Sequence, residues 1–156
     1  THNNKILKKI NNIEFVNKIY NEHHNKLTNL VDELLITNDK VYIFDIHSYS
    51  DNILEYELNK TLNRPDICIG FNEFHMNDTI LNKIKEVLNT MDYSYDFNVP
   101  FEGSIVPLKH LNKNNNVISI MLEINKRLYL KNNVLTNNFE ILKRNILYII
   151  EKIING

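Results

Sequence analysis

The sequence contains almost no cysteine, which excludes two classes of site. Cys68 is the only cysteine among 156 residues, so neither an intrachain disulfide framework nor a zinc cluster held by several thiolates can form. Cys68 lies in the apolar run Asp66-Ile67-Cys68-Ile69-Gly70. We therefore expect a small buried thiol in a reducing compartment, and hence a cytoplasmic protein.

Long apolar runs and dense charge are also missing. No run approaches the roughly 18 apolar residues of a membrane-spanning helix, and no signal-peptide pattern stands at Thr1. The net charge is −1, and no basic run is interleaved with aromatics, so we expect no nucleic-acid and no membrane partner. The zinc-protease H-E-x-x-H motif, a Gly-rich phosphate loop and the serine-hydrolase G-x-S-x-G motif are all absent.

Apolar spacing predicts helices that alternate with short strands in one domain, residues 1–156. Pro100, Gly103 and Pro107 mark a loop that continues to about Asn116. The composition is globular, with 43% hydrophobic and 24% charged residues. An α/β layer structure with a mixed sheet follows. Helices are expected at 12–36, 77–91 and 139–154, a helical turn at 53–58, and strands at 41–46, 66–70, 93–98 and 117–124.

One imidazole directly follows an apolar strand. Val41–Ile46 run into His47, and reactive groups in α/β proteins tend to lie at the carboxyl ends of strands. His47 is a candidate metal ligand, since a catalytic zinc usually has three protein ligands and an open position. Asp45 lies two residues earlier on the same strand face, and it either orients His47 or serves another group. Alternatively, His47 is a structural residue held by hydrogen bonds.

A carboxylate ends a second apolar strand. Glu123 follows the buried-type run 117–122, where an unpaired carboxylate would be costly. Glu123 is therefore either paired, with Arg127 as a candidate partner, or functional with a shifted pKa. In a metal hydrolase, such a residue takes a proton from water and passes it to the leaving nitrogen. His47 and Glu123 together predict one site at the strand ends.

Two arginines and a glycine are candidates for substrate contact. Arg64 and Arg127 can each hold a substrate carboxylate through a bidentate contact, or each can form an ion pair between loops. Gly103 allows close approach of a substrate, or it simply permits a turn.

The other histidines are less suggestive of a site. His23 and His24 lie near the apolar stripe of the first helix, so each is either a partly buried residue or a ligand. Polar segments surround the remaining three, which are expected at the surface: His2, His75 and His110.

Five phrases in register resemble the N-formylglutamate amidohydrolase family, which is related in fold to the zinc carboxypeptidases. They include an Asp-x-His-Ser strand end, an Asn-x-Pro-aromatic-x-Gly loop and a signature similar to Leu-Glu-Ile-Asn-Arg-x-Leu-Tyr. The phrases are Tyr20-Asn21-Glu22-His23-His24-Asn25-Lys26-Leu27, Phe44-Asp45-Ile46-His47-Ser48, residues 64–70, Asn98-Val99-Pro100-Phe101-Glu102-Gly103, and residues 122–129.

The resemblance implies a three-layer α/β/α fold with a mixed sheet. It also implies a zinc-dependent hydrolysis of the amide of a small N-formyl or N-acyl amino acid. By resemblance, His47 is the last zinc ligand and Glu123 the general base. Substrate-binding positions are Ser48, Arg64, Gly103 and Arg127, with His24 and Asp45 as site support.

The sequence departs from the family at two places. Lys126 stands where many relatives have Arg, with Arg127 beside it. Nothing before Asn12 resembles the relatives' first metal ligands, a His and an acidic residue, or their substrate-binding Asn-Arg pair. We therefore expect the fold to lack the N-terminal strands, as the carboxyl-terminal part of a larger hydrolase. The alternatives are a non-catalytic binding or regulatory domain that has lost the metal site, and a carboxypeptidase-type peptidase.

Overall fold

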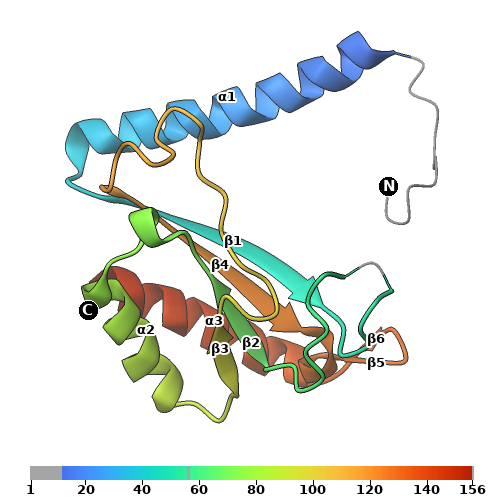
Figure 1. Cartoon of the computed structure of the whole chain (residues 1–156). Coiled ribbons are helices and arrows are strands. Elements are labelled where there is room, and N and C mark those ends of the chain that lie inside the picture. Colours follow the sequence, from blue (N-terminus) through green and yellow to red (C-terminus); the bar gives the residue numbers. More distant parts are fainter. Residues whose placement is uncertain (1–11, 56, 156) are drawn as a thin grey trace.

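A computed structural model of the chain describes residues 12–55 and 57–155. Within these residues, three α-helices and six strands are joined by loops and short 3-10 turns (Figure 1). The elements are α1 (Ile13–Thr37), β1 (Val41–Tyr49), β2 (Ile67–Gly70), η2 (Glu73–His75), α2 (Asp78–Asn89), β3 (Tyr95–Phe97), β4 (Val117–Asn125), η3 (Lys126–Leu128), β5 (Leu130–Lys131), β6 (Val134–Leu135) and α3 (Asn138–Asn155).

The helices begin where asparagine side chains can cap them. The Asn12 side chain accepts a hydrogen bond from the Phe15 N–H at 2.9 Å, and Asn77 does the same for Ile80 at 2.9 Å. Each bond satisfies one backbone donor that the first helical turn leaves unpaired. The three helices predicted from apolar spacing are thus confirmed.

The sheet is mixed, with strand order β1-β4-β2-β3. β1 and β4 are parallel, β2 is antiparallel to β4, and β3 is parallel to β2. β1 extends beyond the predicted end at Ile46 because it stays paired with β4 as far as Tyr49 and Asn125. The register places His47 directly beside Glu123.

One face of the sheet carries the main core. Alternate residues of β4, among them Ile118, Ile120 and Leu122, pack against α2 and α3 together with Ile67 and Ile69 of β2. Period-two alternation of β4 puts its other side chains on the opposite face. That opposite face therefore receives Glu123, and the matching residues of β1 include Asp45 and His47.

A smaller core lies on the opposite face. Val31 of α1 packs with Val41, Val106 and Val117. Asp32 of α1 accepts hydrogen bonds from Lys109 at 2.6 Å and from His110 at 2.8 Å, which tie the end of α1 to the loop after Pro107. Helices thus lie on both sides of the sheet, and the three-layer arrangement is confirmed.

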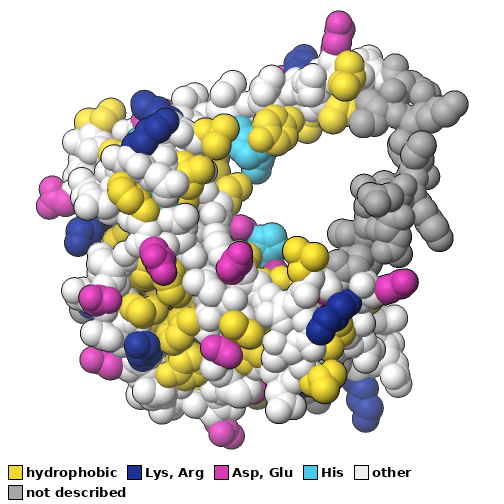
Figure 2. All heavy atoms as spheres, in the orientation of Figure 1, with side chains coloured by type: hydrophobic (Ala, Val, Ile, Leu, Met, Phe, Trp, Pro, Cys, Tyr) yellow, Lys and Arg dark blue, Asp and Glu magenta, His cyan; other side chains and the backbone are white. Residues whose placement is uncertain are grey.

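Most of α1 lies away from the sheet. Its apolar stripe stays largely exposed toward the amino-terminal end, as for Phe15, Ile19 and Tyr20. Figure 2 shows wide open space between α1 and the body below it, bordered by apolar and histidine side chains. The predicted amphipathic helix therefore forms, but only its carboxyl-terminal part packs on the sheet.

Two local features differ from what the sequence predicted. The helical turn predicted at 53–58 is a single turn, closed by a bond from Glu57 N–H to the Leu54 carbonyl at 3.0 Å. The hairpin of β5 and β6 was missed, although Asn132 and Asn133 have the positive φ values, 51° and 61°, that tight hairpin turns require. Two consecutive asparagines, which follow Leu130-Lys131 and precede Val134-Leu135, were the available signal for this hairpin.

His75 and His110 were wrongly expected at the surface, since both are buried. The His75 Nδ1–H donates to the Val117 carbonyl at 2.8 Å, and Nε2 accepts from the Asn112 N–H at 2.9 Å. These backbone partners satisfy a neutral imidazole inside the core. His2 lies outside the described residues.

Cys68 is buried as predicted. Its Sγ lies 3.2 Å from the Phe101 carbonyl, and burial raises the pKa of the thiol to about 11. In residues 12–55 and 57–155, no helix has both the length and the apolar character needed to cross a bilayer.

Two glycines allow the loop after β3 to approach β2, and they provide a stability test. A Cβ on Gly70 would lie 2.4 Å from Met121 Cε and 2.5 Å from the Gly103 carbonyl oxygen, whereas Gly103 has φ +82° and open space around it. We expect Gly70→Ala to lower the free energy of unfolding by about 2 kcal/mol through overpacking. Gly103→Ala should cost about 1 kcal/mol through backbone strain alone. Urea titration measures both, and an equal or larger loss for Gly103→Ala would contradict the close approach at Gly70.

Candidate active site at the strand ends

The site begins with an imidazole held by a carboxylate on the same strand. His47 Nε2 lies 2.8 Å from Asp45 Oδ1, and the His47 side chain is 49% exposed. Alternation along β1 places both side chains on one face, as the sequence predicted. Asp45 therefore orients the His47 ring, leaving Nδ1 as the ring nitrogen that can meet a ligand.

Glu123 lies beside this pair, and no ion pair joins it to a residue in the described part of the chain. Its Oε2 atom is buried and has no hydrogen-bond partner among the described residues. Burial raises the pKa of Glu123, and Asp45 raises it further, while His47 and Lys126 oppose the rise. The predicted alternative of a Glu123–Arg127 pair does not form. An unpartnered, partly buried carboxylate next to an imidazole is an arrangement suited to accepting a proton.

An open hollow of about 630 Å³ lies beside Glu123. Its floor includes Met121 and Phe101, and the segment of residues 57–59 borders it. Asn98 shapes its wall: this residue has φ +55°, and its Oδ1 accepts from the backbone N–H groups of Phe71 at 2.9 Å and Gly103 at 3.3 Å. The full lining is Glu57, Leu58, Asn59, Asn98, Pro100, Phe101, Glu102, Met121 and Glu123.

Arg64 lies buried behind this hollow. Its side chain is fully buried, and its guanidinium carbon lies 5.7 Å from the Tyr49 ring and 5.8 Å from the Phe101 ring, two rings that also contact each other. It donates to the Ser50 carbonyl at 2.9 Å and forms an ion pair with Glu57. Arg64 thus binds a carboxylate, but in this structure the carboxylate belongs to the protein.

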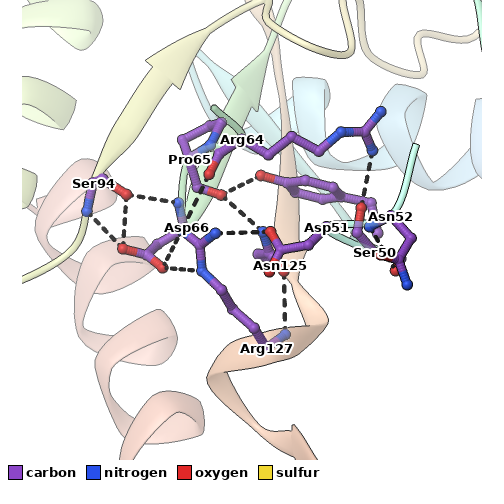
Figure 3. Close-up of polar contacts among 10 residues, drawn as sticks. Ser50, Asp51, Asn52, Arg64, Pro65, Asp66, Ser94, Asn125 and Arg127 are labelled. Atoms are coloured by element: carbon purple, nitrogen blue, oxygen red, sulfur yellow. Dashed lines mark hydrogen bonds and ion pairs between the residues drawn. The ribbon is translucent and has the colours of Figure 1, made fainter. Parts of the chain in front are cut away.

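Arg127 joins the end of β4 to two loop carboxylates, as Figure 3 shows. It donates to Asp51 at 2.7 Å and to Asp66 at 2.9 Å, and to the Arg64 carbonyl at 3.1 Å. Asn125 also donates to Asp51 at 2.6 Å. Of the two sequence alternatives for Arg127, the structure contains the ion pair between loops.

Three of the remaining candidates are not next to Glu123. Ser48 alternates to the other face of β1, where it lines a largely apolar hollow with Tyr129 and residues of α3. The His24 ring packs against the Tyr20 ring within α1, with centroids 4.1 Å apart and planes tilted by 47°. No contact joins His24 to His47 among the described residues. Gly103 follows Glu102 in the hollow's rim and forms a turn with positive φ.

Glu57 and Glu102 are site residues that the sequence analysis did not single out. Both line the hollow beside Glu123. Glu102 stood inside a recognised phrase, directly before Gly103, so its position was the available signal. Glu57 lies in an irregular segment, and no sequence pattern there indicated a site residue.

The described residues do not form a complete metal site. Within residues 12–55 and 57–155, no group of three His, Cys, Asp or Glu side chains lies close enough to hold a metal ion. His47 supplies one nitrogen, and a catalytic zinc needs about three protein ligands.

The comparison with protein families shows to which family the chain belongs. The model of the N-formylglutamate amidohydrolase family matches residues 8–130. The chain belongs to this family. The matched range contains all five recognised phrases in full, which confirms the resemblance.

The crystal structure of N-formylglutamate amidohydrolase from Ralstonia eutropha JMP134 has a similar fold, with a TM-score of 0.68 and 19% sequence identity. The similarity covers 83% of this chain and 49% of that chain, so this chain spans about half the length of that protein. No curated protein matches the sequence. At 19% identity, the similarity to this crystal structure establishes the α/β fold of this N-formylglutamate amidohydrolase family member.

Glu123→Gln tests the raised pKa through stability. A carboxyl with a raised folded-state pKa contributes stability that is present below its unfolded pKa, about 4.3, and lost as pH rises through the folded pKa. The neutral amide removes this loss, so we expect Tm at pH 7 to rise by about 2–4 °C, or about 1 kcal/mol. Parent and variant should converge near pH 4.

The control for this thermal-denaturation series is Glu151→Gln, which changes an exposed carboxylate on α3. We expect no pH-dependent difference from that variant. A lower Tm for Glu123→Gln at pH 7 would show that the Glu123 carboxylate is stabilising and paired in solution.

Proposed function

We propose that this chain carries the general base and one metal ligand of an amidohydrolase that cleaves the amide of N-formyl or N-acyl amino acids. The observation that carries the proposal is the pairing of His47 with Glu123 on neighbouring parallel strands. Membership of the N-formylglutamate amidohydrolase family supports the reaction class. The raised pKa of Glu123 supports its role as the base.

The reaction places a proton on Glu123 and then removes it. A water oxygen attacks the carbonyl carbon while the Glu123 carboxylate accepts the water proton. When the carbon–nitrogen bond breaks, Glu123 returns that proton to the leaving nitrogen. The products are formate, or another carboxylate, and the free amino acid. The unpartnered Oε2 gives the proton an acceptor site that no other described residue occupies.

Zinc is the proposed metal, with His47 as one ligand. A bound zinc ion polarises the carbonyl and lowers the pKa of water. Because the described residues lack a three-ligand group, the other donors must come from outside them. The 2.8 Å contact of Asp45 with His47 fits the carboxylate that commonly orients a metal-bound imidazole.

Arg64 is the proposed partner of the substrate carboxylate. Its guanidinium already binds Glu57, which lines the hollow beside Glu123. Gly103 would shape the rim of that hollow. Arg127 is held by Asp51 and Asp66, and Ser48 lies on the other face of β1. We therefore assign both residues supporting roles at the strand ends.

A second candidate function is a binding domain without catalysis. The missing ligand group among the described residues favours it. The two candidates differ in one measurable property, which is zinc retained by the complete protein.

The test uses protein expressed from its complete coding sequence, assayed for zinc by mass spectrometry and for formate released from N-formyl amino acids. We expect His47→Ala to lose zinc and activity. Glu123→Gln should keep zinc and lose about 10²- to 10⁴-fold in kcat, the usual contribution of a general base. Glu151→Gln serves as the matched control. Zinc and activity that survive His47→Ala would refute the assignment, and absence of zinc from the parent protein would favour the binding domain.

A further inference from the structure

We infer that Asn98 is a substrate-binding residue. Its side-chain amide nitrogen, Nδ2, donates a hydrogen bond to an oxygen atom of the bound N-formyl or N-acyl amino acid. The inference rests on the proposed function, because it adds a residue that holds the same substrate. Asn98 and Glu123 line the same hollow, so a substrate beside the proposed base also lies beside this amide.

The loop around Asn98 fixes which end of the amide group a ligand can meet. Oδ1 accepts hydrogen bonds from the backbone N–H groups of Phe71 at 2.9 Å and Gly103 at 3.3 Å, so the oxygen is used within the protein. No hydrogen bond joins Nδ2 to another described residue, and Nδ2 is not among their buried unsatisfied side-chain atoms. Its N–H groups are therefore open to a ligand.

Asn98 is anchored to the main sheet. Its backbone N–H donates to the Ile69 carbonyl of β2 at 2.9 Å, and β2 pairs with β4, the strand that carries Glu123. The φ of Asn98 is +55°, a left-handed conformation that asparagine adopts more readily than most residues. A donor held in this way loses little conformational entropy when it binds a ligand.

The hollow presents few groups that can donate to a substrate. Its charged lining residues are all carboxylates, and one of them, Glu57, is already paired with Arg64. Ionised carboxylates accept hydrogen bonds and do not donate them, whereas the oxygen atoms of an N-formyl amino acid need donors. Among the described lining residues, side-chain N–H groups come from Asn59 and Asn98 alone. Asn98 is anchored on β2, whereas Asn59 lies in an irregular segment.

The test uses two substitutions of Asn98, in protein expressed from its complete coding sequence with zinc present. Asn98→Asp removes the Nδ2 donor, but it keeps an oxygen for the two backbone N–H groups and accommodates the same φ. Asn98→Gly removes the whole amide group, allows the φ and adds no charge. If Asn98 only holds the loop, Asp can replace it, and if the hollow only needs a neutral residue there, Gly can replace it. Binding through Nδ2 predicts a loss in both variants.

Hydrolysis of N-formyl-L-glutamate should show this loss in KM. We expect KM to rise by about three- to tenfold for Asn98→Gly and by about tenfold or more for Asn98→Asp, while kcat changes by less than about twofold. Both constants are taken from the plateau of the pH profile, because a carboxylate at position 98 would raise the pKa of Glu123 and shift the profile to higher pH. The Tm of Asn98→Asp should stay within about 2 °C of the parent, and that of Asn98→Gly should fall by about 2–4 °C.

Asn77→Asp is the matched control. The Asn77 Oδ1 also accepts from a backbone N–H, that of Ile80 at 2.9 Å, but Asn77 is not among the residues that line the hollow beside Glu123. We expect its KM to equal that of the parent protein.

An unchanged KM in either Asn98 variant, or a loss confined to kcat, would overturn the inference, while hydrolysis by the parent protein leaves the proposed function standing. If the parent protein hydrolyses no N-formyl or N-acyl amino acid, the proposed function fails and the inference fails with it.

Discussion

The in-register pairing of β1 with β4 is the constraint on which the rest of the site depends. It places His47 beside Glu123, and it brings Tyr49 level with Asn125 at the ends of the two strands. A slip of one residue would send every side chain of β1 to the opposite face. The apolar residues that alternate with Asp45 and His47, such as Phe44, pack on the main core and hold this register.

A polar network stabilises the loop that follows β1. Arg127, Asp51 and Asp66 join the end of β4 to residues on both sides of Pro65, and the Tyr49 hydroxyl donates to the Pro65 carbonyl (Figure 3). Arg64, just before Pro65, is thereby held near Phe101 and Glu57. In the same network, Arg127 is paired with Asp51 and Asp66, and it is not among the residues that line the hollow.

The three helices and the four strands of the main sheet could be predicted from the sequence because each follows from local periodicity. The meeting of His47 with Glu123 was predicted from their places at strand ends and from the family resemblance, and it depends on the pairing of β1 with β4. The burial of His75 and His110 could not be predicted. His75 is buried because Val117 and Asn112 supply backbone partners, and His110 because Asp32 accepts from it. These partners lie far away in the sequence, and no local pattern around either histidine indicates them.

The sequence by itself determined the residue types at the strand ends, the alternation that puts Asp45 and His47 on one face, and the family. Only the tertiary structure decided how the charges are paired: Arg127 with Asp51 and Asp66, Arg64 with Glu57, and Glu123 with no cation among the described residues. The physical reason is the distance along the sequence over which each kind of interaction acts. Alternation and apolar spacing act between neighbouring residues, whereas ion pairing and burial depend on loops that long-range packing brings together.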